Sequence, residues 1–196
     1  MIPRRVETMI LIFIRIALVL IAALFGVLCL VEPEYNKYGG VLASFVLPFL
    51  PVIVEKLFKV KVSLRLQLIY YVFLFVSLYM GINMDLYKTV PYFDKVVHLL
   101  SGALSIILGH YALVFFKLEK SPKLFRALFM VCFAIAIGVL WEFFEFGCDK
   151  LLGQSMQQLV SVGVDDTMYD LLAATIGAIL ASIWMVNQKN LKFLEK

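Results

Sequence analysis

The chain has 196 residues, of which 63% are hydrophobic and only 16% are charged, and its mean hydropathy is +0.95. A soluble domain is ordinarily about 45 to 50% apolar, so this composition excludes an ordinary water-soluble protein and indicates one embedded in a membrane. The formal net charge of +4 gives no reason to propose a nucleic-acid partner, and we expect membrane lipids as the partners of the basic loops.

Six apolar segments are long enough to cross a bilayer, which takes about 20 residues of helix. In chain order they are residues 9–31, 39–54, 65–84, 95–116, 126–147 and 167–187. Because lipid accepts only helices or closed barrels and strand-like alternation is absent, the sequence predicts an all-α bundle of six transmembrane helices. The connections are short, so we expect one integral-membrane domain over residues 1–196. Pro48 and Pro51 predict a kink in the second segment.

The placement of lysine and arginine predicts the orientation, because these residues favour cytoplasmic loops. Most of them, beginning with Arg4 and Arg5, fall on one side of the membrane if both termini are cytoplasmic. We therefore expect a multi-pass protein of the cell (inner) membrane with both ends inside. Arg15 lies within the first segment, where it would snorkel to the cytoplasmic surface or meet Glu55.

Ionisable side chains at the ends of the last three segments are the strongest functional signal. An aspartate at the centre of a membrane helix costs about 2.5 to 3.5 kcal/mol, so it needs a partner, a cation or water. Residues three or four apart share one helix face, so each of the three helices contributes a pair. The pairs predict an outer layer and an inner layer, with Asp149 and Asp165 at the rim. The outer layer holds Asp94, Glu145 and Asp166, and the inner layer holds His98, Glu142 and Asp170.

Small residues continue the faces of these three pairs toward the cytoplasm. Such residues allow membrane helices to approach closely, so we expect the last three helices to be mutual neighbours. The rows are Ser101, Gly102, Ser105 and Gly109 on the fourth helix, Gly138 and Ala134 on the fifth, and Ala173, Ala174, Gly177 and Ala181 on the sixth.

Three short motifs follow one another in this half of the chain: DKVVHLLSG at 94–102, WEFFE at 141–145 and DTMYDL at 166–171, the last followed by Gly177. Their combination, over roughly residues 90 to 182, resembles the YjdF-like family of small bacterial inner-membrane proteins, and more distantly VanZ-like proteins. The first resemblance implies no particular reaction. The second implies cell-envelope or glycopeptide-resistance biology, although the W-E-x-x-E motif departs from that pattern.

Three hypotheses remain open for the cluster. Carboxylates and imidazole are ligands for divalent metals, so the six residues would bind Zn, Mn, Fe, Mg or Ca, and a metal-bound water would serve hydrolysis at the outer face. Crowded carboxylates also share protons, which is the basis of a proton- or ion-coupled transporter. Structurally, Asp94, Asp165 and Asp166 would cap helices and the other acids would tie helices together.

The positive charge that balances the acids distinguishes a metal ion from a salt bridge. We expect no lysine or arginine deep among the acids, because Lys95, the nearest, would turn toward the headgroups. A metal ion is then preferred over a salt bridge. No catalytic residue is indicated, and the sequence contains no P-loop, nucleophile elbow or dinucleotide fingerprint.

Overall fold

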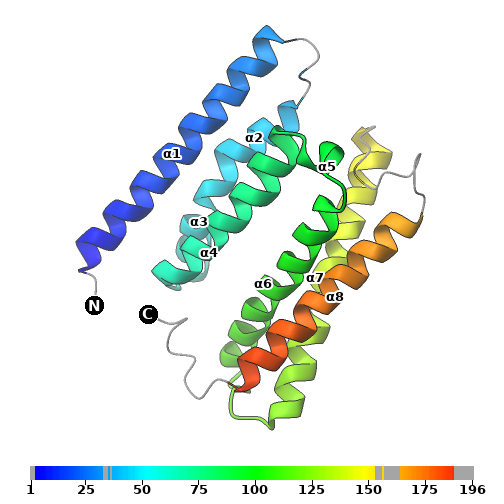
Figure 1. The fold of residues 1–196 in the computed structure, drawn as a ribbon. Helices are drawn as coiled ribbons and strands as arrows, with labels where there is room; N and C mark the ends of the chain where they lie inside the picture. Colours follow the sequence, from blue (N-terminus) through cyan, green and yellow to red (C-terminus); the bar gives the residue numbers. More distant parts are fainter. Residues whose placement is uncertain (1–2, 33–34, 36, 153–155, 157–163, 188–196) are drawn as a thin grey trace. The chain divides into compact units, whose positions relative to one another are not determined.

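The structure, a computed structural model, describes residues 3–32, 35, 37–152, 156 and 164–187. These residues form helices joined by short connections, and there is no strand among them (Figure 1). Six helical segments of the described chain are long and apolar enough to cross a membrane, so the predicted all-α polytopic membrane protein is confirmed. Their bounds are Arg4–Val31, Tyr38–Phe58, Leu64–Asn83, Phe93–Phe115, Lys123–Leu151 and Val164–Asn187.

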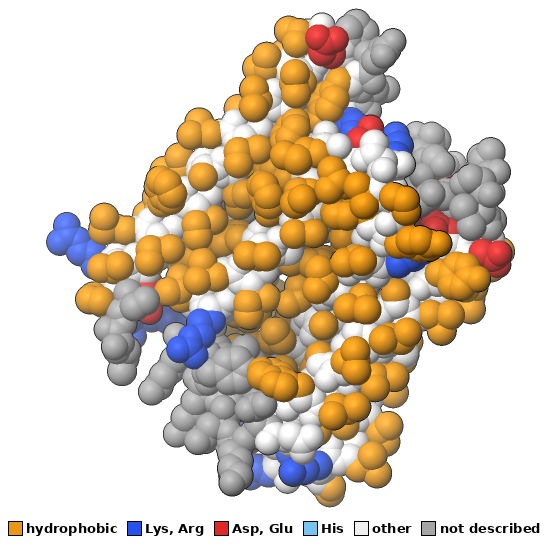
Figure 2. Space-filling view, in the orientation of Figure 1, with side chains coloured by type: hydrophobic (Ala, Val, Ile, Leu, Met, Phe, Trp, Pro, Cys, Tyr) orange, Lys and Arg blue, Asp and Glu red, His pale blue; other side chains and the backbone are white. Residues whose placement is uncertain are grey.

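The chain divides into two compact units, one within residues 1–91 and one within residues 92–189. A single domain over residues 1–196 stays a prediction, and each unit is described by itself. Hydrophobic side chains cover most of the face shown in Figure 2, and many large apolar residues are exposed along the helices. This pattern is typical of helices whose outer surfaces contact lipid.

The first unit contains three candidate spans and one short helix. Where Pro48 and Pro51 predicted a kink, a 3-10 turn interrupts the second span, because proline has no N–H to donate to the preceding turn. The third span changes from α-helix to π-helix halfway along its length. The elements are α1 (Arg4–Val31), α2 (Tyr38–Val46), η1 (Leu47–Phe49), α3 (Leu50–Phe58), α4 (Leu64–Leu74), the π-helix η2 (Phe75–Asn83) and α5 (Leu86–Thr89).

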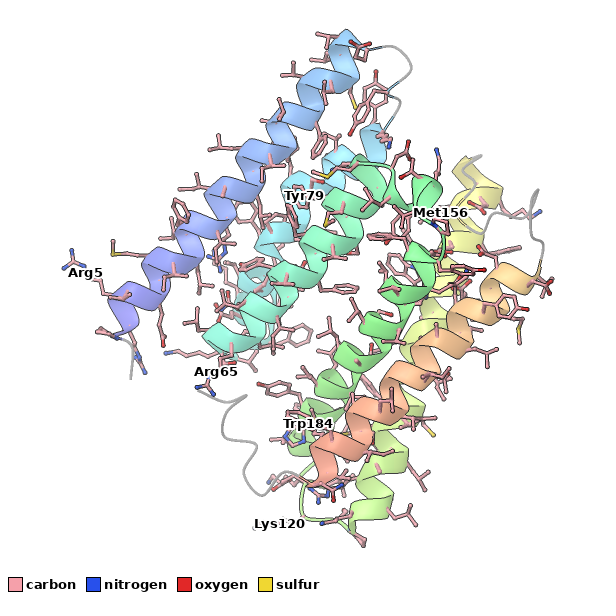
Figure 3. All side chains as sticks on the ribbon, in the orientation of Figure 1. Arg5, Arg65, Tyr79, Lys120, Met156 and Trp184 are labelled. Carbon is pink, nitrogen blue, oxygen red and sulfur yellow. The ribbon has the colours of Figure 1, made fainter. Side chains whose placement is uncertain are left out.

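The core of this unit has a polar centre around Tyr79, which is fully buried (Figure 3). Its hydroxyl lies 3.1 Å from the carbonyl oxygen of Leu18 on α1 and 2.9 Å from that of Ser44 on α2. Asn83 donates from Nδ2 to Oγ of Ser44 at 2.8 Å. Buried polar groups need such partners, so these bonds join α1, α2 and η2.

An ion pair lies in the connections of the first unit, outside the spans. Lys37 Nζ lies 2.9 Å from Oδ1 of Asp85, and Lys88 Nζ lies 3.7 Å from the same oxygen. Burial opposes ionisation of Asp85, but the hydrogen bond and charge of Lys37, together with Lys88, outweigh it and lower the pKa of this carboxyl from its usual 3.8.

We expect Asp85→Asn to lower the melting temperature slightly at neutral pH. Asparagine tolerates the left-handed backbone at this position, where φ is 65°, so the change removes charge without strain. Because the folded pKa is lowered, the contribution of Asp85 is fully present above its unfolded pKa and is lost as pH falls through the folded value. Thermal unfolding of both proteins between pH 7 and pH 3 should therefore show a difference that shrinks with acidification. A difference that grows with acidification would contradict this assignment.

The second unit consists of α6 (Phe93–Phe115), α7 (Lys123–Leu152) and α8 (Val164–Asn187). Each of the three helices packs against the other two, which confirms the predicted neighbourhood (Figure 1). The contact between α6 and α8 depends on glycine: a Cβ at Gly102 would collide with the carbonyl oxygen of Ala174, and a Cβ at Gly177 with that of Leu99. Gly102 of the α6 row and Ala174 and Gly177 of the α8 row therefore lie where the backbones of the two helices approach closely.

Candidate functional site

The α6 helix carries three of the site's side chains near its N-terminal end. It begins after Tyr92, and Asp94 lies in its first turn. His98 follows one turn later on the same face and is buried, with 7% of its surface exposed. On α8, Asp166 lies in the first turn and Asp170 one turn further, and both are buried.

Lys95 joins these acids. Its ammonium lies 2.6 Å from Oδ1 of Asp166, 2.8 Å from Oδ1 of Asp170 and 3.2 Å from Oδ2 of Asp94. One cation thus bonds carboxylates on both α6 and α8. We call Asp94, Lys95, His98, Asp166 and Asp170 the α6–α8 cluster.

The prediction that Lys95 turns toward the headgroups is therefore wrong. The stem of a lysine has four methylenes, and the gap to α8 is narrow because Gly102 and Gly177 bring the helices together. Three carboxylates at the mouths of two helices then attract the ammonium more strongly than water or lipid headgroups do. A salt bridge, which the sequence argument ranked below a metal, is present in the cluster.

His98 lies between two of the carboxylates. Its Nε2 is 3.6 Å from Oδ1 of Asp94 and 3.7 Å from Oδ1 of Asp170. These separations are longer than hydrogen bonds. Asp94, His98 and Asp170 each offer one ligand atom, and these three atoms lie within 4.8 Å of one another. Among the described residues, this is the one set of ligand side chains close enough together to hold a metal ion.

The α7 helix contributes Glu142 and Glu145, which are both buried. Trp141 donates from Nε1 to Oε1 of Glu145 at 2.7 Å, a bond between residues one turn apart. Glu145 also interacts electrostatically with Glu142, Asp94 and Asp170. The two glutamates thus lie beside the α6–α8 cluster, outside its compact ligand group.

Asp149 and Asp165 were predicted at the rim of the cluster, and Asp94 was predicted to cap a helix. Asp149 accepts a hydrogen bond from the backbone N–H of Met156 at 2.6 Å, and Asp165 is exposed. Asp94 was expected to cap α6, but the residue at the cap position is Tyr92, whose side chain makes no capping bond. The carboxylate of Asp94 turns to Lys95 and His98 instead, because a charged partner is stronger than a neutral backbone N–H.

All six residues predicted from the sequence lie at this end of the second unit, but only three form the compact ligand group. Sequence reasoning missed Lys95 as a cluster member and Trp141 as a partner of Glu145. The three motifs together contain five carboxylates and one lysine. This imbalance of charge could have indicated that Lys95 pairs with the acids. For Trp141 the signal was its spacing of four from Glu145, which places both on one helix face.

Helices that are long and apolar enough to cross a membrane six times define an integral membrane protein. Residues 12–190 match the family described as predicted membrane protein (DUF2238), and the chain belongs to this family. An uncharacterized protein of Thermotoga maritima is 29% identical over 130 residues, and the match covers 66% of each chain. The chain thus spans about two thirds of the length of this relative. No solved structure matches.

Proposed function

We propose that the protein is a YjdF-like, multi-pass protein of the cell membrane that binds a divalent cation at the α6–α8 cluster. Asp94, His98 and Asp170 would supply the first ligands, and Glu142, Glu145 and Asp166 would complete the shell or balance its charge. The distant VanZ-like resemblance favours a role in the cell envelope. Both termini would face the cytoplasm, which puts the site near the outer surface.

The distances around His98 carry this proposal. With metal-to-ligand bonds of about 2.1 Å, neighbouring ligand atoms in a tetrahedral site lie about 3.4 Å apart. The separations of 3.6 and 3.7 Å from Nε2 of His98 to the two carboxylate oxygens are close to that spacing. The imidazole lies near two carboxylates but beyond hydrogen-bonding distance from them. A cation bound between these three groups would draw their ligand atoms closer together.

Charge supports the same conclusion. Asp94, Asp166, Asp170, Glu142 and Glu145 bring five carboxylates to one end of three helices, and Lys95 is the basic residue that the structure places among them. Repulsion between carboxylates in a medium of low dielectric is strong, so further positive charge stabilises the unit. The imidazole favours Zn, Mn or Fe, and the oxygen-rich surroundings would also suit Mg or Ca.

Metal analysis of variants tests the proposal. We expect His98→Ala and Asp170→Asn to weaken binding by more than the roughly 10- to 100-fold cost of losing an outer-shell partner, because each removes a direct ligand. Elemental analysis of the purified full-length protein and calorimetric titration with Zn²⁺ and Mn²⁺ would measure this loss.

The chain offers matched controls. His110→Ala removes the other histidine of α6, and Asp165→Asn removes an exposed acid of α8; both should leave binding unchanged. Glu142→Gln distinguishes a three-residue ligand set, which it would spare, from the six-residue set, which it would disrupt. The metal proposal fails if the wild-type protein binds no divalent cation, or if His98→Ala binds as tightly as His110→Ala.

Proton- or ion-coupled transport is the second candidate. It is favoured by the way Lys95 is shared among Asp94, Asp166 and Asp170, since protonation of one carboxylate would redistribute its bonds among the others. Proteoliposomes with a trapped pH indicator would report proton flux. Flux that is lost in Asp170→Asn, without divalent-ion binding in the wild type, would favour transport over metal binding.

A further inference from the structure

Arg15 lies about three turns into α1, within the first candidate span, and its hydrogen-bond partners are neutral. Its Nε donates to the hydroxyl oxygen of Tyr71 at 2.7 Å, and its Nη2 donates to Oε1 of Gln67 at 2.8 Å. The expected meeting with Glu55 is not what the structure shows: that carboxylate accepts a bond from the backbone N–H of Val62 at 2.9 Å. Among the described residues, no carboxylate forms an ion pair with Arg15.

A guanidinium in this position needs a counter-charge. Arginine stays protonated, and it carries five N–H donors, of which the bonds to Tyr71 and Gln67 use two. Neutral acceptors satisfy hydrogen bonds but do not neutralise charge. The groove around Arg15 holds three basic residues, Arg4, Arg15 and Lys61, against the two acids Glu7 and Glu55, and a charge that is only partly compensated in a membrane span is costly. An anion that reaches Arg15 would therefore bind favourably.

Two grooves of the first unit meet at Arg15. The first, of about 260 Å³, is polar and contains Arg4, Arg15 and Lys61 together with Glu7 and Glu55, so cations exceed anions. The second, of about 280 Å³, is apolar and is lined by Ile12, Arg15, Ile16, Val19, Leu20 and Phe49. The pair of grooves resembles a phospholipid in its polarity: a charged end continues into an apolar track along α1.

The depth of the guanidinium also suits a headgroup. Gln67, which binds it, lies in the first turn of α4, and its Nε2 donates to the carbonyl oxygen of Val62 in the connection before that helix. The guanidinium is thus about one helical turn from this connection. A side chain on α1 also leans toward the N-terminal end of its helix, and so toward the same membrane surface.

We propose that Arg15 binds the phosphate of an anionic phospholipid whose acyl chain lies in the groove of Ile12, Ile16, Val19, Leu20 and Phe49. A phosphate accepts paired hydrogen bonds from a guanidinium, and the excess of basic residues favours a headgroup with net negative charge. The occupant comes from the bilayer itself, into which this face of α1 is inserted. The site lies wholly in the first unit and does not depend on the cation proposal.

Native mass spectrometry of the full-length protein in mixed micelles of phosphatidylglycerol and phosphatidylcholine tests this site. We expect the wild type to retain phosphatidylglycerol in preference to phosphatidylcholine, and Arg15→Gln to bind it at least about tenfold more weakly, since a hydrogen bond to a charged group is lost. The matched control is Arg5→Gln, because Arg5 is exposed, lies outside both grooves and points away from α1 (Figure 3). It should retain the lipid.

A second variant keeps the test decisive if Arg15→Gln fails to fold. Val19→Trp enlarges a side chain that lines the apolar groove and keeps Arg15 itself, and it should reduce lipid retention, whereas Phe13→Trp, at a position 73% exposed on the same helix, should not. Equal retention of both lipids by the wild type would overturn the proposal. So would undiminished phosphatidylglycerol binding in Val19→Trp, or in a folded Arg15→Gln protein.

Discussion

Alanine at Gly102 is expected to destabilise the unit formed by α6, α7 and α8 strongly. The new methyl group would collide with the backbone carbonyl of Ala174, and the same change at Gly177 would collide with the carbonyl of Leu99. Backbone atoms cannot rotate away as side chains can, so the two helices must separate. Overpacking of this kind costs about 1–3 kcal/mol and occasionally more, and Gly102→Leu should prevent folding of the unit.

Gly147 provides the matched control on α7. A Cβ there meets no atom within 4 Å, and alanine is intrinsically favoured over glycine in a helix by about 1 kcal/mol. We therefore expect Gly147→Ala to be neutral or stabilising and Gly102→Ala to be destabilising, although the chemical change is identical. Thermal unfolding in detergent measures both; equal melting temperatures would show that α6 and α8 do not approach as closely as described.

The spans and the contact between α6 and α8 could be predicted from the sequence, because both depend on residues close together within one helix. Hydropathy over about 20 residues marks each span, and the structure places the six helices close to the predicted ranges. Rows of small residues at helical spacing mark faces that can approach a neighbour, and Gly102, Ala174 and Gly177 of those rows lie at the contact of α6 with α8.

The partners of long polar side chains could not be predicted in this way. Lys95 was expected to turn toward the headgroups, yet it binds acids of α8. Arg15 was expected to snorkel or to meet Glu55, and the partners Tyr71 and Gln67 on α4 were not foreseen. The flexible stems of Lys95 and Arg15 reach in several directions from one position. Which direction is taken depends on the rotation and closeness of the neighbouring helices, and a single sequence does not specify these.

Lys95→Met is expected to strengthen divalent-cation binding by more than tenfold. The ammonium lies 2.8 Å from Oδ1 of Asp170, which is 3.7 Å from Nε2 of His98. A metal bound to that oxygen with a bond of about 2.1 Å would therefore lie within about 5 Å of the ammonium. At an effective dielectric of 20, that repulsion amounts to roughly 3 kcal/mol for each unit charge of the ion. A factor of ten in affinity needs only about 1.4 kcal/mol.

The same variant should be less stable without metal, because the change leaves buried carboxylates uncompensated. Breaking a fully buried ion pair costs roughly 3–5 kcal/mol, and we expect less here because the Lys95 side chain is 23% exposed. Added Zn²⁺ or Mn²⁺ should therefore raise the melting temperature of Lys95→Met more than that of the wild type. Lys95→Arg, which keeps the charge, should not bind metal more tightly than the wild type, and Lys123→Met, at an exposed lysine of α7, should change neither property. If Lys95→Met is destabilised and no divalent ion restores it, Lys95 is itself the cation that the acids require, and the α6–α8 cluster ties two helices together without binding a metal.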